Sequence, residues 1–315
     1  MLQIKSASRA VAATALLCSL LAHSRPSLAA PVEAPPGTTS REALIAADGV
    51  TLAATLHRPA KVKGPLPAVV IVHGSGPTTR EMAAFWTNSA LRAGGIAVLV
   101  YDKRGTGRSS GTYPLWNVAS TAQMFSDLAS DAEHAIRWLA QQPGIDPQRL
   151  GLIGGSQAGW IMPLAASRER LIRFLFIGEG VPLPAGIEEV HSGYLDAVTS
   201  DGKVRPTLRQ VAAADILAED FRGELGYDPA VILALLEVPM MWTFGLYDEV
   251  IPTRMSIERI GELRKQGRAN IDIHIFPFAD HNFRDVFSGE RYDVSTVIRA
   301  WLDDLRITRP DRSRL

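Results

Sequence analysis

The chain has 315 residues, of which 46% are hydrophobic and 21% are charged. These proportions are typical of a soluble globular protein with one large domain or two modest ones, and they argue against a disordered chain. Basic and acidic residues balance at 33 each, whereas proteins that bind nucleic acid usually carry a basic excess, so we expect no nucleic-acid partner. The single cysteine, Cys18, excludes an intramolecular disulfide framework and a zinc site built from cysteines.

The first thirty residues have the pattern of a secretory signal peptide. Lys5 and Arg9 precede an apolar run at 10–22, and small residues follow at 27–30. This order predicts that residues 1–30 are removed and that the protein is exported, to the periplasm or out of the cell. A short membrane anchor and a buried helix are the alternatives, but the run is short for a bilayer and a proline-rich stretch follows it.

Attachment to a membrane is not expected once this segment is removed. Leu16 and Leu17 precede Cys18, whereas a lipoprotein acylation site needs small residues there. After residue 30 the sequence has no run of eighteen apolar residues, which is the length that a membrane-spanning helix needs. The sequence therefore predicts no stable membrane anchor.

Residues 31–40 are rich in proline and small polar residues and are interpreted as a linker. Asp48-Gly49 then separates strand-like runs at 42–47 and 50–58, which predicts an antiparallel hairpin. Beyond the hairpin, short apolar runs alternate with amphipathic segments. Strands are predicted at 67–72, 96–101, 150–153, 172–177, 238–244 and 271–276, and helices at 83–92, 121–141, 253–265 and 294–305.

This alternation indicates an α/β fold with a mostly parallel, doubly wound sheet that has helices on both faces. The opening hairpin adds antiparallel strands at one edge. Residues 181–237 interrupt the alternation with a stretch rich in helix formers, and structureless loops of that length are uncommon. We therefore expect one domain over residues 41–310, with a helical insertion at 181–237 that acts as a cap.

The segment Gly-Gly-Ser-Gln-Ala-Gly at 154–159 joins a predicted strand directly to a helix. A serine in such a tight turn is strained and exposed above the sheet, and the residues two before and two after it must be small. Gly154 and Ala158 meet this condition, so we expect Ser156 to be a nucleophile. The alternative is a glycine-rich helix start with a serine cap.

A serine needs a base, which is usually a histidine oriented by a carboxylate. In sheets of this kind active residues follow the carboxyl ends of strands, in the order serine, acid, histidine. His281 follows the last predicted strand, and Asp248 follows the strand at 238–244. Glu249 and Asp280 are the neighbouring carboxylates that fit less well. An ordinary loop histidine and a helix-capping aspartate are the alternatives.

An oxyanion also needs hydrogen-bond donors. The backbone N–H of Gln157, next to the nucleophile, is the first candidate. The second should come from the loop His-Gly-Ser-Gly at 73–76, whose glycines permit a close backbone approach. We expect the N–H of Ser75 to be this donor, with Gly76 as the second choice.

Five motifs in this order resemble those of the α/β-hydrolase superfamily. They are the loop at 73–77, the Asp-Lys-Arg-Gly-Thr-Gly-Arg-Ser run at 102–109, the serine segment at 154–159, the acid loop at 245–252 and the histidine loop at 280–283. The resemblance covers nearly the whole chain after the signal peptide. It implies a structural role for Asp102 and Arg104. Within the superfamily the chain is similar to secreted bacterial serine esterases and to the catalytic domains of prolyl-oligopeptidase-type hydrolases.

We therefore expect a serine hydrolase that cleaves small-molecule carboxylic esters through an acyl-enzyme. A serine peptidase or amidase that acts on small peptides uses the same triad and stays open as an alternative. A non-catalytic binding protein on a hydrolase scaffold is a third. No metal or organic cofactor is expected, because the dinucleotide-binding glycine spacing, a Walker A loop and a His-Glu-x-x-His motif are all missing from the sequence. No pattern indicates an oligomeric state.

Overall fold

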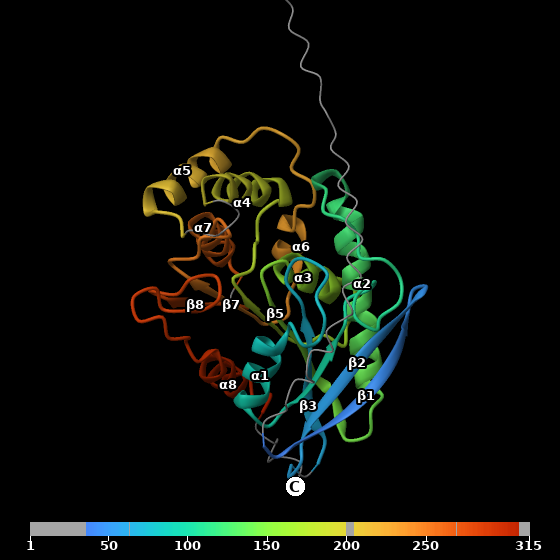
Figure 1. Ribbon diagram of the computed structural model, residues 1–315. Coiled ribbons are helices and arrows are strands. Elements are labelled where there is room, and N and C mark those ends of the chain that lie inside the picture. Colours follow the sequence, from blue (N-terminus) through green and yellow to red (C-terminus); the bar gives the residue numbers. More distant parts are fainter. Residues whose placement is uncertain (1–35, 63, 200–204, 269, 309–315) are drawn as a thin grey trace, which may run out of the picture. The chain divides into compact units, whose positions relative to one another are not determined.

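One eight-stranded sheet, with the strand order β1-β2-β4-β3-β5-β6-β7-β8, organises the chain (Figure 1). The structure is a computed structural model that describes residues 36–62, 64–199, 205–268 and 270–308. The predicted signal peptide at 1–30 and residues 31–35 of the predicted linker lie outside these ranges. Among the described residues, no helix combines the length and the apolar character that a membrane crossing requires.

The sheet is mixed, as the sequence predicts. β1 (Thr38–Ala47) and β2 (Val50–Pro59) form the antiparallel hairpin, in which Gly49 has a φ of 72°. β2 then pairs antiparallel with β4 (Ala97–Tyr101). The remaining strands pair in parallel: β3 (Leu66–Val72), β5 (Ile145–Gly155), β6 (Leu175–Gly178), β7 (Met240–Gly245) and β8 (Ile271–Phe276). The predicted fold class is confirmed.

The hairpin begins earlier than expected. β1 starts at Thr38, so the prediction of a linker over 31–40 is wrong for its last three residues. Thr38 pairs with Pro59, and the hydroxyl of Ser40 lies 2.8 Å from Nδ1 of His57. These small polar residues suggested a linker, but an edge strand continues as long as its partner offers backbone hydrogen-bonding groups.

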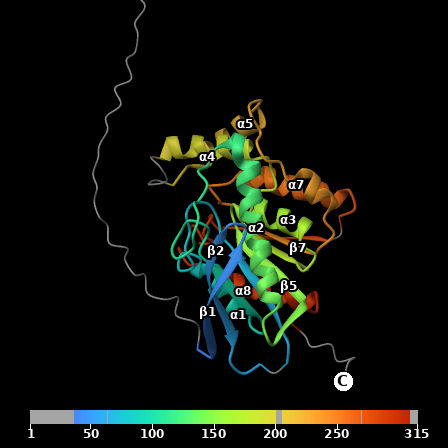
Figure 2. The ribbon, with the colours of Figure 1, turned by 90° about the vertical axis from the view of Figure 1, so that its right-hand side faces the viewer.

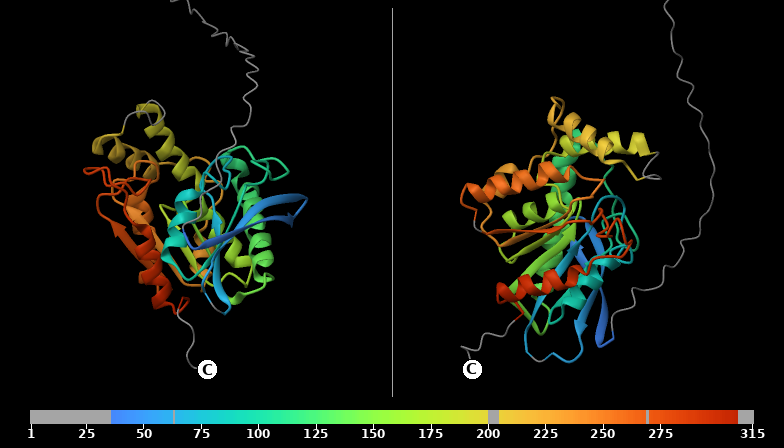
Figure 3. Two further views of the ribbon diagram at one scale, coloured as in Figure 1. Left: turned by 60° about the horizontal axis from the view of Figure 1, so that its bottom comes forward. Right: turned by 90° about the vertical axis from the view of Figure 1, so that its left-hand side faces the viewer.

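Helices cover both faces of the sheet (Figures 2 and 3). α1 (Ala84–Ala93) and α8 (Val294–Asp304) pack side by side on one face. The opposite face is covered by α2 (Thr121–Ala140), which follows the short 3₁₀ helix η1 (Val118–Ser120), and by α3 (Ala158–Arg168) and α7 (Thr253–Lys265). Because of this double cover, β3 and β4 are buried along their whole length, which explains their continuous apolar sequences.

The insertion between β6 and β7 is helical. It contains α4 (Ala185–Thr199), α5 (Leu208–Glu219) and α6 (Ala230–Leu235), and α4 and α5 lie side by side at the top of Figure 1. Arg254, in the first turn of α7, donates a hydrogen bond of 3.2 Å to Asp215 of α5. Since α7 follows the carboxyl end of β7, this contact puts the insertion on the side of the sheet where active residues of such folds lie.

Candidate active site

Ser156 lies in the connection between β5 and α3. Only Ser156 and Gln157 separate these elements, and Ser156 has a φ of 56°, in the left-handed region that residues with side chains rarely adopt. Its N–H donates to the carbonyl oxygen of Gly178 (3.0 Å), and its carbonyl oxygen accepts the N–H of Gly159 (2.8 Å). These bonds hold a sharp strand-to-helix turn that presents the serine at the carboxyl end of the sheet.

The small residues on either side of the serine have a steric reason. A Cβ at Gly154 would lie 2.2 Å from the carbonyl oxygen of Val72 and 3.0 Å from the Cβ of Ala158. A side chain at this position would therefore push β3 and α3 away from the turn. The spacing that marks this segment in the sequence reflects a close backbone contact in the fold.

Asp248 and His281 meet at the carboxyl ends of two neighbouring strands. Asp248 lies in the loop between β7 and α7, and His281 lies in the loop after β8. Nδ1 of His281 is 2.7 Å from Oδ2 of Asp248. Oδ1 of Asp248 accepts the backbone N–H groups of Val250 (2.8 Å) and Ile251 (3.2 Å), so hydrogen bonds hold both oxygens of the carboxylate.

Each member of this pair changes the proton affinity of the other. Burial opposes the charged form of His281, but the charge of Asp248 and the hydrogen bond to it raise the pKa of the imidazole above its usual value. Burial also opposes the charge of Asp248, but the interaction with His281 keeps the pKa of this carboxyl below its usual value. The Asp248 side chain is fully buried while that of His281 is 17% exposed, so the histidine is the member that a substrate can reach.

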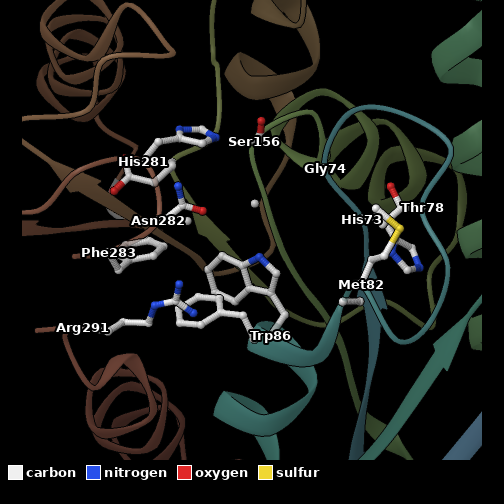
Figure 4. Close-up of a pocket in the computed structure, with 15 residues that line it drawn as sticks. His73, Gly74, Thr78, Met82, Trp86, Ser156, His281, Asn282, Phe283 and Arg291 are labelled. Atoms are coloured by element: carbon white, nitrogen blue, oxygen red, sulfur yellow. The ribbon is translucent and has the colours of Figure 1, made fainter. Parts of the chain in front are cut away.

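Ser156 and His281 line one cavity of about 200 Å³. Figure 4 shows a ring nitrogen of His281 turned toward the side chain of Ser156. Much of the remaining wall is apolar and includes Met82, Phe85, Trp86 and Phe283. The structure thus brings Ser156, His281 and Asp248 together, and their roles in a triad stay a prediction.

The predicted oxyanion donors have different surroundings. Gly74 lies against the serine, because a Cβ at this glycine would be 3.3 Å from the Cβ of the serine. The N–H of Gly76 donates to the phenol oxygen of Tyr113 (3.1 Å), so this donor is already used and Gly76 is not supported as an oxyanion residue. Ser75 remains the donor expected from the loop, and Gln157 the one expected from the turn.

A buried lysine, which the sequence prediction missed, lies behind this loop. Lys103 is 2% exposed, and burial lowers its pKa to about 7. Its Nζ donates to the carbonyl oxygens of Gly74 (2.5 Å) and Gly76 (3.1 Å). It also donates to Oε1 of Gln157 (3.0 Å). Because the C=O and N–H of a trans peptide point in opposite directions, a Gly74 carbonyl that faces Lys103 turns the N–H of Ser75 away from the lysine.

The residues on either side of the lysine hold the loop together. Asp102 accepts the backbone N–H groups of Arg80 and Arg108, both at 2.8 Å. Arg104 forms a two-pronged ion pair with Asp131, with both hydrogen bonds at 2.8 Å. Neither Asp102 nor Arg104 is among the described residues that line the cavity, which agrees with a structural role for both. The described part of the chain has no group of three or more His, Cys, Asp or Glu side chains placed to hold a metal ion.

Comparisons with known sequences find one family model and several relatives that match parts of this chain. A model of the X-Pro dipeptidyl-peptidase (S15) family matches residues 48–177, a segment that contains Ser156 but ends before Asp248 and His281. A thiohydrolase of Aspergillus aculeatus is 32% identical over 138 residues, which cover 44% of this chain and 40% of that protein. An esterase of Thermotoga maritima is 27% identical over 242 residues, which cover 70% of this chain and 55% of that protein. The matches thus span only 40% and 55% of these relatives' lengths.

The fold has counterparts among solved structures. An esterase of Pyrococcus furiosus aligns with a TM-score of 0.60, over 84% of this chain and 91% of the other. The sequence identity is 16%, so this likeness concerns the fold. The mixed eight-stranded sheet, the helices on both faces and the likeness to this esterase agree with one another, and this chain has the α/β-hydrolase fold.

Proposed function

We propose that this chain is a serine hydrolase that cleaves carboxylic esters through an acyl-enzyme. The arrangement around the cavity supports this most directly. Ser156 occupies a strained turn, His281 lines the same cavity, and the carboxylate of Asp248 lies 2.7 Å behind the histidine. A serine nucleophile needs a base to take its proton, and the base needs a third group to orient it. The three side chains meet both needs.

In the proposed reaction, Oγ of Ser156 attacks the acyl carbon while Nε2 of His281 takes the hydroxyl proton. Asp248 holds the opposite ring nitrogen and stabilises the imidazolium that forms. The N–H groups of Ser75 and Gln157 bind the negative oxygen of the tetrahedral intermediate. His281 then gives its proton to the leaving alcohol, and water activated by the same histidine hydrolyses the acyl-enzyme.

The cavity favours small substrates. Its volume of about 200 Å³ is below the roughly 300–1,000 Å³ of pockets that hold drug-sized ligands. The aromatic side chains of Phe85, Trp86 and Phe283 suit an apolar acyl group. We therefore propose esters with short acyl chains, and a helical insertion at 181–237 that acts as a cap and sets the choice of substrate.

A fluorophosphonate probe tests the nucleophile. We expect one covalent adduct on Ser156, located by peptide mass spectrometry, and no adduct at that position in the Ser156→Ala variant. The labelled protein should lose its activity on p-nitrophenyl acetate and butyrate in proportion to the extent of labelling. Folded wild-type protein that takes no label on Ser156 would rule the proposal out.

A peptidase or amidase is the second candidate, and the match to a dipeptidyl-peptidase family over residues 48–177 favours it. The two candidates share their chemistry, so only the substrate separates them. We would compare kcat/KM on aminoacyl p-nitroanilides with that on p-nitrophenyl esters, and on acyl thioesters because one relative is named a thiohydrolase. A higher value on the anilides would assign the chain to the peptidases. Ligand binding without turnover of any substrate would support a non-catalytic binding protein.

Residues 1–30 are also proposed to direct export, because they show the basic, apolar and small-residue order of a signal peptide. Cells that express the full chain should place it outside the cytoplasm in a form shortened by about thirty residues. A variant that lacks residues 2–30 should stay in the cytoplasm. A full-length product that remains in the cytoplasm would contradict this proposal.

A further inference from the structure

Glu179 is a buried carboxyl that the proposed reaction does not use. It directly follows β6, is 1% exposed, and lies between Gly178 and Gly180. Like Asp248, it stands at the carboxyl end of a strand beside the site. It also lines the same cavity as Ser156.

The backbone at Glu179 is costly for a residue with a side chain. Its φ is 47°, in the left-handed region where a glycine would lie without strain. The glycines on both sides have no room for a side chain, since a Cβ at Gly178 would lie 2.2 Å from the ring of Trp86 and one at Gly180 would lie 2.4 Å from Ile177. A glutamate in this conformation indicates that its carboxyl makes interactions that offset the strain.

Those interactions connect the end of β6 with the end of β7. The backbone N–H of Glu179 donates to the carbonyl oxygen of Thr243 (2.9 Å), and its Oε1 accepts the N–H of Gly245 (2.8 Å). Its Oε2 is buried and receives no hydrogen bond from an N–H or hydroxyl donor among the described residues. The carboxyl groups of Glu179 and Asp248 also lie close enough for each to change the proton affinity of the other.

Two carboxyl groups share a hydrogen bond only if one of them carries a proton. Asp248 accepts hydrogen bonds from His281 and from two backbone N–H groups of its own loop, whereas Glu179 accepts the N–H of Gly245. The negative charge is therefore better stabilised on Asp248, and the proton belongs on Glu179. In agreement, burial and the neighbouring charge of Asp248 raise the pKa of Glu179 well above its usual value.

We propose that Glu179, in its protonated form, is a positioning residue that donates a hydrogen bond to Asp248. This bond would fix the orientation of the carboxylate that contacts His281. This inference rests on the proposed serine-hydrolase function. The proposed line of interacting side chains then runs from Ser156 through His281 and Asp248 to Glu179. A donor on Asp248 makes that anion a weaker base, so it raises the proton affinity of His281 less than an unassisted carboxylate would.

Two substitutions separate the protonated state of Glu179 from the ionised state. Glu179→Gln keeps a neutral side chain with an N–H for Asp248 and an oxygen for the N–H of Gly245. Glu179→Met removes both groups at similar volume. An ionised Glu179 would raise the pKa of His281 by its charge, and Glu179→Gln would then lower that pKa. Glu249→Gln is the control for loss of a charge, because the negative charge of Glu249 raises the pKa of His281.

The acid limb of the pH profile of kcat/KM, measured on p-nitrophenyl butyrate, reports the pKa of the proposed base, His281. For Glu179→Gln we expect the wild-type acid limb and a kcat within about threefold of the wild-type value. For Glu179→Met we expect kcat to fall roughly 10- to 100-fold with KM little changed, and the limb to move to higher pH. Glu249→Gln should move the limb to lower pH. A downward shift in Glu179→Gln, or a wild-type kcat and limb in Glu179→Met, would overturn the inference.

An NMR titration makes the test independent of turnover. The proton on Nδ1 of His281 reports the charge of the imidazole in any folded variant, and thermal unfolding shows which variants fold. Glu179→Gln preserves both hydrogen bonds and is the variant expected to fold, so its titration alone decides. The wild-type pKa of His281 in this variant supports the inference, and a lower pKa overturns it. If wild-type protein cleaves no ester, thioester or amide, the proposed function fails while this titration still decides the state of Glu179.

Discussion

The ammonium group of Lys103 donates a hydrogen bond of 2.5 Å to the carbonyl oxygen of Gly74, whose backbone packs against the serine. Lys103→Met removes this bond and frees the predicted donor, the N–H of Ser75, to turn out of place. Since loss of one oxyanion donor costs roughly 100- to 1,000-fold in kcat, we expect a loss of that order with KM little changed. Lys61→Met, at an exposed lysine, is the control. A folded Lys103→Met with wild-type kcat would show that the loop does not depend on this contact.

The proton on Lys103 should also link stability to pH. Burial lowers the pKa of Lys103 to about 7 in the folded protein, whereas an unfolded lysine has a pKa of about 10.4. Between these values the unfolded chain binds more protons than the folded chain, so this group makes the fold more stable as pH rises. We would measure the free energy of unfolding in urea for wild type and for Lys103→Met. The difference between the two, wild type minus variant, should increase from pH 7 to pH 9.5. A constant difference would mean that Lys103 stays charged throughout.

Substitutions of Arg104 and Arg108, which lie in one motif, should differ sharply in their effect on the free energy of unfolding. Arg104 pairs with Asp131, whose side chain is fully buried, whereas the Arg108 side chain is 68% exposed. Arg104→Met leaves a buried carboxylate unpaired and should cost about 3–5 kcal/mol of unfolding free energy. Arg108→Met should change it by less than about 0.5 kcal/mol. Urea unfolding measures both variants. If Arg104→Met instead lowered kcat at wild-type stability, the structural role of this residue would be wrong.

We expect Trp86, which lines the cavity, to limit the length of the acyl chain of the proposed ester substrates. Its ring lies so close to the strand ends that a Cβ at Gly155 or Gly178 would approach it to 2.6 or 2.2 Å. Trp86→Ala removes a wall of the cavity, so kcat/KM on p-nitrophenyl octanoate should rise about tenfold relative to the butyrate ester. Met82→Ala, at a cavity residue that is 67% exposed, should change this ratio less. An unchanged ratio in Trp86→Ala would place the acyl chain elsewhere.

The order of strands and helices and the three triad candidates were predictable because each depends on a local pattern. Apolar runs reveal buried strands, and chemistry in such a sheet gathers at the carboxyl ends of those strands. Ser156, Asp248 and His281 all follow this rule, and the structure brings them together. The beginning of β1 was not predictable, because polar residues became a strand through pairing with β2.

The residues that the sequence prediction missed are charged groups whose burial depends on distant parts of the chain. Lys103 lies in a motif that was interpreted as structural, and its partners are carbonyls of another loop. Glu179 follows the carboxyl end of a strand, as Asp248 does, so the same rule applied to every strand end would have identified it. Gly76 was a reasonable donor until Tyr113, 37 residues further along the chain, was found to bind its N–H.

Asp248→Asn tests whether Asp248 is the acid of the proposed triad. An asparagine favours the wrong tautomer of His281, so we expect kcat to fall about 10⁴-fold. The base acts in its neutral form, so activity is lost as pH falls through the pKa of His281. Because the charge of Asp248 raises that pKa, its removal should move the acid limb of kcat/KM to lower pH.

Asp280→Asn is the matched control for this substitution. Asp280 precedes His281 in the chain, but its Oδ1 accepts the N–H groups of Asn282 and Arg284, and its Oδ2 pairs with Arg205. It therefore cannot orient the imidazole, and its amide should keep kcat within about tenfold of the wild-type value. An equal loss of kcat in both variants, or an acid limb that does not move in Asp248→Asn, would remove Asp248 from the triad.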